Sequence, residues 1–493
     1  MDTQKYILGI DQSTQGTKML LFDKNGKIIT RTDRPHRQLV NKAGWVSHDM
    51  DEIYRNIISE IKELTETLHI RGGEIAGIGI SNQRETTAAW DENGRPVCPA
   101  VVWQCGRAAS IAQQTGENPD AARQIQSVTG LPLSPFFPAC KMRWLLDHDC
   151  KDTDIRKLHL GTVDSYLVYR LTRGRVFATD ASNASRTQLM NLDTRCWSQD
   201  LCEIFHIPQS VLPEILDSNG YFGETDFDGV LDKKVPICSV MGDSHSALYG
   251  QKCHQAGEMK ITYGTGSSIM LNTGSTKTLS SHGLAASLAW SISGRADYVL
   301  EGNINYTGAV ISWLKDDLGL ISSAGEVNAL CAAANPEDTT VIVPAFTGLS
   351  APYWENRVHA GIFGMSRTTR KAELVRAATD SIAQQVTDVF EAMELDFARP
   401  VQEVRTDGGP AKNPYLMQLQ SDLTGTAVNA CETEELSAIG TAYLAGITAG
   451  LYDEKNVFEN LAYHCYSPDM AAETKKKKRD SWKAAVSGVM QYA

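Results

Sequence analysis

Short apolar runs that end in polar clusters recur along the chain, and the first gives the clearest pattern. Residues 6–10 are mostly apolar and lead to Asp11, a polar stretch follows at 12–18, and residues 19–22 are apolar again. Two runs of this kind around a polar tip with glycine predict a β-hairpin. Hydroxyl and amide groups crowd the tip beside an acid, which suits a turn that holds phosphate next to a divalent cation. Most such tips are plain turns, so this stretch alone leaves both interpretations open.

The same pattern returns in the second half of the chain. Residues 257–274 again show an apolar run, a Gly/Thr/Ser tip at Gly264–Ser268 and an apolar run back. This repeat predicts two versions of one α/β domain, each opened by a hairpin, with the two tips facing each other across a cleft. A chain of 493 residues is also too long for one hydrophobic core. We therefore expect two domains, 1–250 and 251–493.

Two other apolar runs end in polar groups that could form a site. Residues 75–80 predict a buried strand followed by a polar cluster at 82–85, and ligands gather at the carboxyl ends of such strands in α/β folds. Residues 235–242 predict a strand that runs into Asp243, with a helix from near Ser244. The local pattern leaves open whether Asp243 caps that helix or points toward a ligand.

Helical periodicity and a glycine-rich turn mark further elements. A helix is predicted over 51–68 with Asp51 as its cap, and a long amphipathic helix over 372–392. Small residues dominate 437–450, a predicted helix that can pack closely. The turn at 407–410 places bare backbone N–H groups at a helix N-terminus, which favours phosphate or adenosine.

Composition narrows the classes of function. Lys and Arg number 47 against 59 Asp and Glu, a net charge of −12 that disfavours nucleic acid and anionic membranes as partners. The 11 cysteines have scattered spacings without a C-x-x-C pair, which favours reduced thiols. No basic segment with a long apolar run opens the sequence, and no apolar run approaches the roughly 18 residues of a membrane span. We expect a cytoplasmic protein that binds neither nucleic acid nor membrane.

Glycine-rich turns at 9–17, 264–266 and 408–409 could hold a nucleotide. None is a Walker A loop, and none is a dinucleotide-binding fingerprint after a strand. The remaining interpretation is a two-domain clamp with phosphate-holding hairpins and acids at Asp11 and Asp243. On these grounds a phosphotransferase, an actin-like ATPase and a sugar sensor without transfer all remain open.

Longer motifs extend over the whole chain. They are ISNQRETT (80–87), VVWQC (101–105), FFPACKMRWLLDH (136–148), GTVDSYL (161–167), NASRT (183–187), MGDSHSALYGQ (241–251), TYGTGS (262–267), PAFTGLSAPYW (344–354), AGIFGMSR (360–367) and DGGPAKNPYLMQLQSD (407–422). In these segments the chain resembles the FGGY carbohydrate kinases, and within them the glycerol kinases most. The resemblance implies an α/β protein of two ribonuclease-H-like (actin-like ATPase) domains that close on ATP, Mg²⁺ and a small polyol or sugar. It also implies a homo-oligomer, a dimer or tetramer.

The resemblance assigns roles to residues on the phosphate side. Asp243 falls at the general base, and Asp11 at the acid that holds Mg²⁺ through water. Lys18 stands where the family usually has Arg, and Ser312 where the glycerol kinases usually have Gln. The positions that match phosphate or nucleotide contacts are Thr14, Gln15, Gly16, Lys18, Thr265, Gly308, Ser312, Gly409 and Asn413.

On the acceptor side, Arg84, Glu85 and Trp103 match residues that hold the hydroxyl groups and carbon backbone of glycerol, with Asp243 beside them. Three neighbours depart from the glycerol pattern: Phe136 replaces Tyr, Ser244 replaces Gln and Ser268 replaces Phe. The two serines make the expected pocket roomier and more polar. Glycerol is the first choice of acceptor, and a tetritol or a ketose of the xylulose or ribulose type is the alternative.

Overall fold

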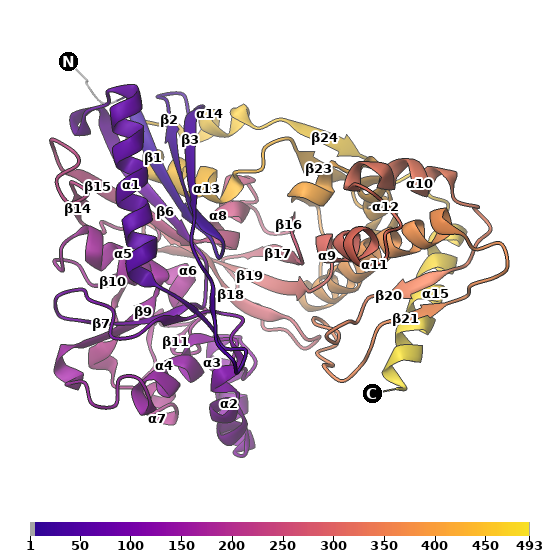
Figure 1. Cartoon of the computed structure of the whole chain (residues 1–493), viewed down its shortest axis with the longest axis horizontal. Coiled ribbons are helices and arrows are strands. Elements are labelled where there is room, and N and C mark those ends of the chain that lie inside the picture. The colour runs from indigo at the N-terminus through magenta and orange to yellow at the C-terminus, as the bar shows by residue number, and fades with distance from the viewer. Residues whose placement is uncertain (1–4, 493) are drawn as a thin grey trace.

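The computed structural model describes residues 5–492, around two mixed β-sheets (Figure 1). Residues 1–4, part of the N-terminal stretch interpreted above, and residue 493 lie outside the described part. The first sheet has the order β14-β15-β6-β1-β2-β3, and its strands are β1 Tyr6–Gln12, β2 Gly16–Phe22, β3 Ile28–Pro35, β6 Ile75–Asn82, β14 Glu224–Thr225 and β15 Val235–Gly242. The second has the order β18-β19-β17-β16-β22-β23-β24, with β16 Glu258–Tyr263, β17 Ser267–Gly274, β18 Ala285–Ile292, β19 Arg295–Ile304, β22 Glu403–Asp407, β23 Val428–Cys431 and β24 Tyr463–Tyr466.

Both predicted hairpins form, and each opens a similar set of strands. β1 pairs antiparallel with β2 and parallel with β6, which pairs parallel with β15. β16 likewise pairs antiparallel with β17 and parallel with β22, which pairs parallel with β23. The orders β3-β2-β1-β6-β15 and β19-β17-β16-β22-β23 correspond strand for strand. The repeat predicted from the apolar pattern is therefore confirmed.

Helices cover the sheets. The main helices are α1 Met50–Leu68, α4 Pro138–Asp147, α5 Val163–Leu171, α6 Ala181–Ala184, α8 Asp243–Gly250, α9 Gly308–Ser312, α11 Lys371–Phe397, α12 Pro414–Thr424, α13 Leu436–Thr448 and α15 Ala472–Met490. A smaller sheet in the first half has the order β4-β5-β8-β7-β9, with β4 Leu39–Val40, β5 Val46–His48, β7 Thr87–Asp91, β8 Ala100–Val101 and β9 Leu158–Thr162. The predicted cap of α1 is wrong by two residues: Asp49, not Asp51, accepts from the backbone N–H groups of Asp51 and Glu52.

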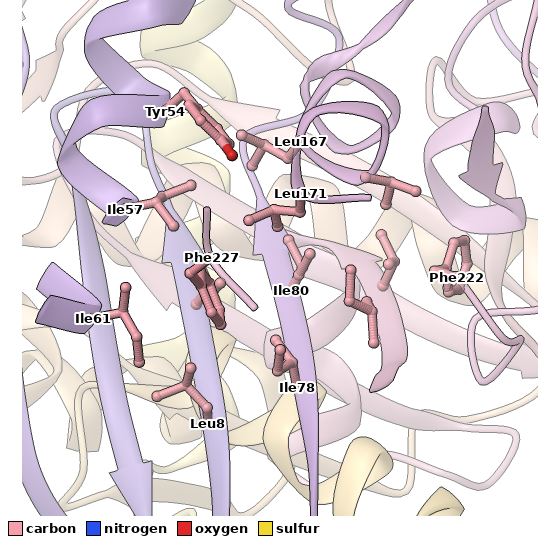
Figure 2. Close-up of a cluster of buried hydrophobic side chains, with 14 of the residues drawn as sticks. Leu8, Tyr54, Ile57, Ile61, Ile78, Ile80, Leu167, Leu171, Phe222 and Phe227 are labelled. Carbon is pink, nitrogen blue, oxygen red and sulfur yellow. The ribbon is translucent and has the colours of Figure 1, made fainter. Parts of the chain in front are cut away.

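One face of the first sheet packs against α1 and α5 (Figure 2). The side chains that meet there are Leu8, Ile78 and Ile80 from the strands, Tyr54, Ile57 and Ile61 from α1, and Leu167 and Leu171 from α5. Burying each aliphatic side chain contributes about 1.5–3 kcal/mol. This core fixes the strand ends that carry the polar clusters.

The opposite face of that sheet packs against α13, which comes from the C-terminal part of the chain (Figure 1). A Cβ atom on Gly79 of β6 would lie 2.4 Å from the Thr441 carbonyl oxygen, and one on Gly440 would lie 1.8 Å from the Ser246 carbonyl oxygen. Only glycine permits these approaches, so α13 fits tightly against both β6 and α8. The expectation that 437–450 packs closely is confirmed, and the helix ties the two halves together.

Alternation along β16 divides the second sheet into an apolar and a polar face. Met259, Ile261 and Tyr263 pack in a core with α11, whereas Lys260 and Thr262 point to the other face. That polar face lies toward the first half of the chain, where α8 packs. Within residues 5–492, no helix is long and apolar enough to cross a bilayer.

Candidate active site

Asp11 lies near the carboxyl end of β1, next to the hairpin turn, and pairs in register with Ser81 of β6. Ser81 Oγ donates to Asp11 Oδ1 at 3.0 Å, and the carboxylate is 7% exposed. Burial raises the pKa of Asp11 to about 6, Lys18 opposes that rise and Asp243 adds to it. The strand ends therefore bring Asp11 and Asp243 close enough for their charges to interact.

Asp243 is the first residue of α8, directly after β15. Gly242 occupies the cap position, so the interpretation of Asp243 as the helix cap is wrong. Asp243 Oδ1 accepts from the backbone N–H of Ser244 at 2.6 Å and from Arg84 Nε at 3.1 Å. The side chain keeps 34% exposure, and Oδ2 accepts from no group among the described residues. One carboxylate oxygen is thus fixed and the other is available to a ligand.

Arg84 is held by a partner that the sequence did not reveal. Its two terminal nitrogens donate to both oxygens of Glu301, on β19, at 2.8 Å each, and Nη2 also donates to Ser244 Oγ at 3.2 Å. Burial disfavours the charged guanidinium, but Glu301, Glu85 and Asp243 outweigh it and hold the pKa of Arg84 well above its usual value. A bidentate pair of this kind fixes the guanidinium plane.

Glu85 and Arg84 do not pair with each other. Glu85 instead accepts from Arg186 Nε at 2.7 Å, and Arg186 also contacts Glu301 at 2.9 Å. The backbone of Glu85 has φ 59°, a region that a non-glycine residue rarely adopts and that is typical of functional sites. The result is a buried alternating network of two arginines and two glutamates that joins the halves of the chain.

Aromatic rings flank this network. The Trp103 and Phe136 rings meet edge to face with centroids 5.6 Å apart, and Trp103 Nε1 donates to Thr14 Oγ1 at 3.0 Å. Lys141 of α4, fully buried, donates to the Phe136 carbonyl oxygen. Burial lowers the pKa of Lys141 to about 7, against the opposing charge of Glu85. Trp103 therefore links the expected acceptor wall to the tip of the first hairpin.

The first hairpin places its predicted phosphate residues at one turn. Thr14 and Gly16 are partly exposed, and Gln15 is exposed. A Cβ on Gly16 would lie 2.7 Å from the Arg34 carbonyl oxygen, so the turn requires glycine there. Lys18 points toward the start of α13, where its Nζ lies 3.0 Å from Glu435 Oε2.

The predicted nucleotide residues of the second half gather at two places. The N–H groups of Gly308 and Ala309 donate to the carbonyl oxygens of Gly264 and Thr265 at 2.9 and 3.0 Å, which joins the second tip to the start of α9. Ser312 lies one turn further along α9 and is exposed.

The second place is the turn after β22. Gly408 has φ 92°, and a Cβ there would lie 2.0 Å from the Tyr263 carbonyl oxygen, which brings the turn against the end of β16. Gly409 is exposed, with nothing within 4 Å of a Cβ. Asn413 Oδ1 caps α12 by accepting from the backbone N–H groups of Tyr415 at 3.0 Å and Leu416 at 3.3 Å.

Ser268 lies on the polar face of the second sheet and is partly exposed. Lys260 Nζ, fully buried, donates to Ser268 Oγ at 3.5 Å and to Thr262 Oγ1 at 3.1 Å. Burial lowers the pKa of Lys260, with Asp407, Glu301 and Asp243 opposing that shift. Lys260 was not identified from the sequence, although a lysine inside an apolar strand run is an available signal.

The arrangement can bind a hydroxylated molecule and accept a proton from it. Asp243 offers a free carboxylate oxygen, Arg84 and Glu85 are held beside it, and the rings of Trp103 and Phe136 supply an apolar wall. Two oxygen-bearing acids whose charges interact, Asp11 and Asp243, also suit a hard divalent cation such as Mg²⁺.

Comparison with known proteins identifies the family of the chain. The model of the N-terminal domain of the FGGY family of carbohydrate kinases matches residues 6–250, and that of the C-terminal domain matches residues 259–449. Glycerol kinase 1 of Thermotoga maritima is 42% identical over 490 residues, which cover 98% of this chain and 99% of that protein. Glycerol kinase of Brevibacillus brevis is 39% identical over 494 residues, with 99% of each covered.

Solved structures extend the comparison. The crystal structure of Plasmodium falciparum glycerol kinase with ADP matches with a TM-score of 0.92 and 32% identity, covering 99% of this chain and 98% of that one. A ligand-bound xylulose kinase from Lactobacillus acidophilus matches with a TM-score of 0.89 at 21% identity, covering 99% and 100% of the two chains, and supports the fold alone. The fold class predicted from the sequence is confirmed.

Proposed function

Because the chain belongs to the FGGY family of carbohydrate kinases, we propose that it transfers the γ-phosphoryl group of ATP to a terminal hydroxyl of a small polyol, with glycerol the first choice. The observation that carries this proposal is the position of Asp243. Its side chain is partly exposed and hydrogen-bonds Arg84 of the acceptor-side network, and its charge acts on Asp11 of the phosphate hairpin. An actin-like ATPase or a sugar sensor needs no such base beside an acceptor site.

In the proposed reaction, Asp243 Oδ2 accepts the proton of the attacking hydroxyl as the new P–O bond forms and the bond to the β–γ bridging oxygen breaks. An alcohol is a poor nucleophile at neutral pH, and a positioned carboxylate contributes about 10²–10⁴-fold to such a step. Arg84 Nε keeps Oδ1 occupied, which aims Oδ2 at the acceptor. Arg84 and Glu85 orient the other hydroxyl groups, while Trp103 and Phe136 pack against the carbon chain.

We propose that the nucleotide lies between the two hairpins. Thr14, Gln15, Gly16 and Lys18 would contact phosphate from one side, and Thr265, Gly308, Ser312, Gly409 and Asn413 would contact phosphate, sugar or base from the other. Asp11 would hold Mg²⁺ through water, and the ion would neutralise phosphate charge. Lys18 can contribute charge but not the bidentate contact of an arginine, and its present partner is Glu435.

We assign residues 1–250 to an acceptor-binding domain that also carries the catalytic acids, and residues 251–493 to a nucleotide-binding domain. Closure of the two would exclude water from the γ-phosphate. We also propose a cytoplasmic homo-oligomer, either a dimer or a tetramer, as the family resemblance implies.

An assay of ADP release with ATP, Mg²⁺ and a panel of acceptors tests the proposed function. We expect turnover with glycerol and only slow ATP hydrolysis without an acceptor. Rapid hydrolysis that no polyol stimulates would favour an ATPase. Pentuloses that react far faster than glycerol would replace the first-choice acceptor but leave the kinase assignment intact.

A further inference from the structure

Two serine hydroxyls, one from each half of the molecule, accept a hydrogen bond from a buried cation. Ser244 Oγ accepts from Arg84 Nη2 at 3.2 Å, and Ser268 Oγ accepts from Lys260 Nζ at 3.5 Å. Both side chains are partly exposed, whereas Arg84 and Lys260 are buried. A serine that accepts through one lone pair turns its own O–H elsewhere. Each serine therefore presents a donor on its accessible side.

Lys260 hydrogen-bonds hydroxyl groups, among them that of Ser268, and pairs with no carboxylate of the described chain. Among the described residues it forms no ion pair, and its hydrogen-bond acceptors are the hydroxyls of Thr262 and Ser268. Thr262 in turn hydrogen-bonds Asp407, its partner in register on β22. The O–H of Thr262 is thus used inside the protein. The O–H of Ser268 has no protein acceptor in the described chain and is left for a ligand.

A continuous polar row connects Ser268 with the acceptor-side network. Ser268 pairs in register with Asn303 of β19, and Asn303 Nδ2 donates to Glu301 Oε1 at 3.2 Å. Glu301 is the bidentate partner of Arg84, which also contacts Ser244. Ser244 follows Asp243 directly and Ser268 is linked to it through Asn303, Glu301 and Arg84, so both serines belong to the same site as Asp243.

A three-carbon triol has no need of these two donors. In the proposed binding mode its reacting hydroxyl contacts Asp243, and its two others contact Arg84 and Glu85. Resting on the proposed kinase function, we propose that Ser244 and Ser268, the latter oriented by Lys260, form a distal subsite for the additional hydroxyls of a longer acceptor, a four- or five-carbon polyol. Their hydroxyl groups donate to the acceptor oxygens beyond the third carbon.

The test measures the ratio of kcat/KM for erythritol, threitol and the pentitols to kcat/KM for glycerol, by ADP release. In the wild-type enzyme at least one longer polyol is expected to support ADP release in addition to glycerol. Ser268→Ala is expected to lower that ratio by about tenfold, the scale of one lost hydrogen bond, because the longer acceptor loses a donor that the three carbons of glycerol do not need. Thr273→Ala, which removes a hydroxyl from β17 that bonds Thr276 within the protein, is the matched control.

Lys260→Met separates an orienting role from a structural one. It is expected to lower the same ratio by a few-fold, and the Lys260→Met/Ser268→Ala double variant is expected to match Ser268→Ala alone, because the two groups act as one unit. A ratio that Ser268→Ala leaves unchanged, or effects of the two substitutions that add, would overturn the inference while the kinase assignment stands. If no polyol supports ADP release, the proposed function fails and the inference falls with it.

Discussion

The hairpins β1–β2 and β16–β17 share strand directions and pairing, but they carry acid and hydroxyl in exchanged positions. In the first half, the hairpin supplies Asp11 and the neighbouring strand β6 supplies Ser81 in register. In the second half, the hairpin supplies Thr262 and the neighbouring strand β22 supplies Asp407 in register. The backbone repeat therefore leaves the side-chain chemistry free to differ.

The residues that pair with Asp11 and Thr262 across each hairpin also differ in charge. Asp11 faces Lys18 on β2, whereas Thr262 faces Ser268 on β17. The acid of the first hairpin interacts with Asp243, but Asp407 is tied down by Gln251 at 2.5 Å and by Thr262. The first hairpin therefore carries the charge that can reach a ligand, while the second presents neutral donors and keeps its acid internal.

The largest expected effect separates the acids of the two halves. Asp243→Asn is expected to lower kcat by at least about a hundredfold with the acceptor KM largely kept, because the amide cannot take the proton. Steady-state kinetics of ADP release measures both constants. Asp407→Asn is the matched substitution and is expected to cost far less activity. Equal losses in the two variants would contradict the assignment of Asp243 as base.

A smaller loss of activity is expected from Glu301→Gln. This substitution removes the negative charge of the β19 carboxylate that pairs with the arginines of the acceptor side. Arg84 and Arg186 would lose the carboxylate that they share, leaving Asp243 to pair with Arg84 and Glu85 to pair with Arg186. We expect kcat/KM for the acceptor to fall by about 10- to 100-fold. Glu403→Gln, which removes the partner of Arg405 on β22, is the control.

Melting temperatures of both variants show whether the fold survives. If Glu301→Gln stays folded and keeps wild-type kcat/KM, the network does not orient Arg84 for catalysis.

Much of this organisation could be predicted from local sequence, and the missed parts have a common cause. The hairpins, Asp11 and Asp243 follow from apolar runs that end in polar residues a few positions away. Glu301 was missed because its partner Arg84 lies 217 residues earlier, and only the fold brings them together. A charge inside a strand otherwise apolar, as at Lys260 and Glu301, is the signal that was available. The pairing of Glu85 with Arg186 has no local signal.

The first hairpin should also be the more sensitive to acid. His36, whose backbone N–H donates to the Gln15 carbonyl oxygen at 3.1 Å, is 7% exposed. Burial lowers its pKa to about 4, and His48, which faces it with ring centroids 4.6 Å apart, adds to the shift. A depressed histidine pKa gives stability that is present above the unfolded value of 6.5 and is lost as pH falls toward 4.

His36 is therefore expected to lower the melting temperature as pH falls from 6.5 to 4, and protonation of Asp11, whose pKa is raised to about 6, opposes that fall. His36→Leu should flatten that fall, whereas His464→Leu, at an exposed position of β24, should not. A pH profile that is the same in wild type and His36→Leu would show that His36 does not titrate in this way.

The most direct measurement of the central claim is the Mg²⁺ dependence of acceptor-stimulated ADP release in wild type, Asp11→Asn and Asp407→Asn. The account predicts that Asp11 helps to hold the Mg²⁺ ion that accompanies ATP. Asp11→Asn is then expected to raise the Mg²⁺ concentration that gives half-maximal rate by about tenfold, the scale of one lost contact. Asp407→Asn then leaves that concentration within about twofold of wild type, and removal of Mg²⁺ by chelation stops all three. An unchanged Mg²⁺ requirement in Asp11→Asn, or a larger shift in Asp407→Asn, would contradict the account.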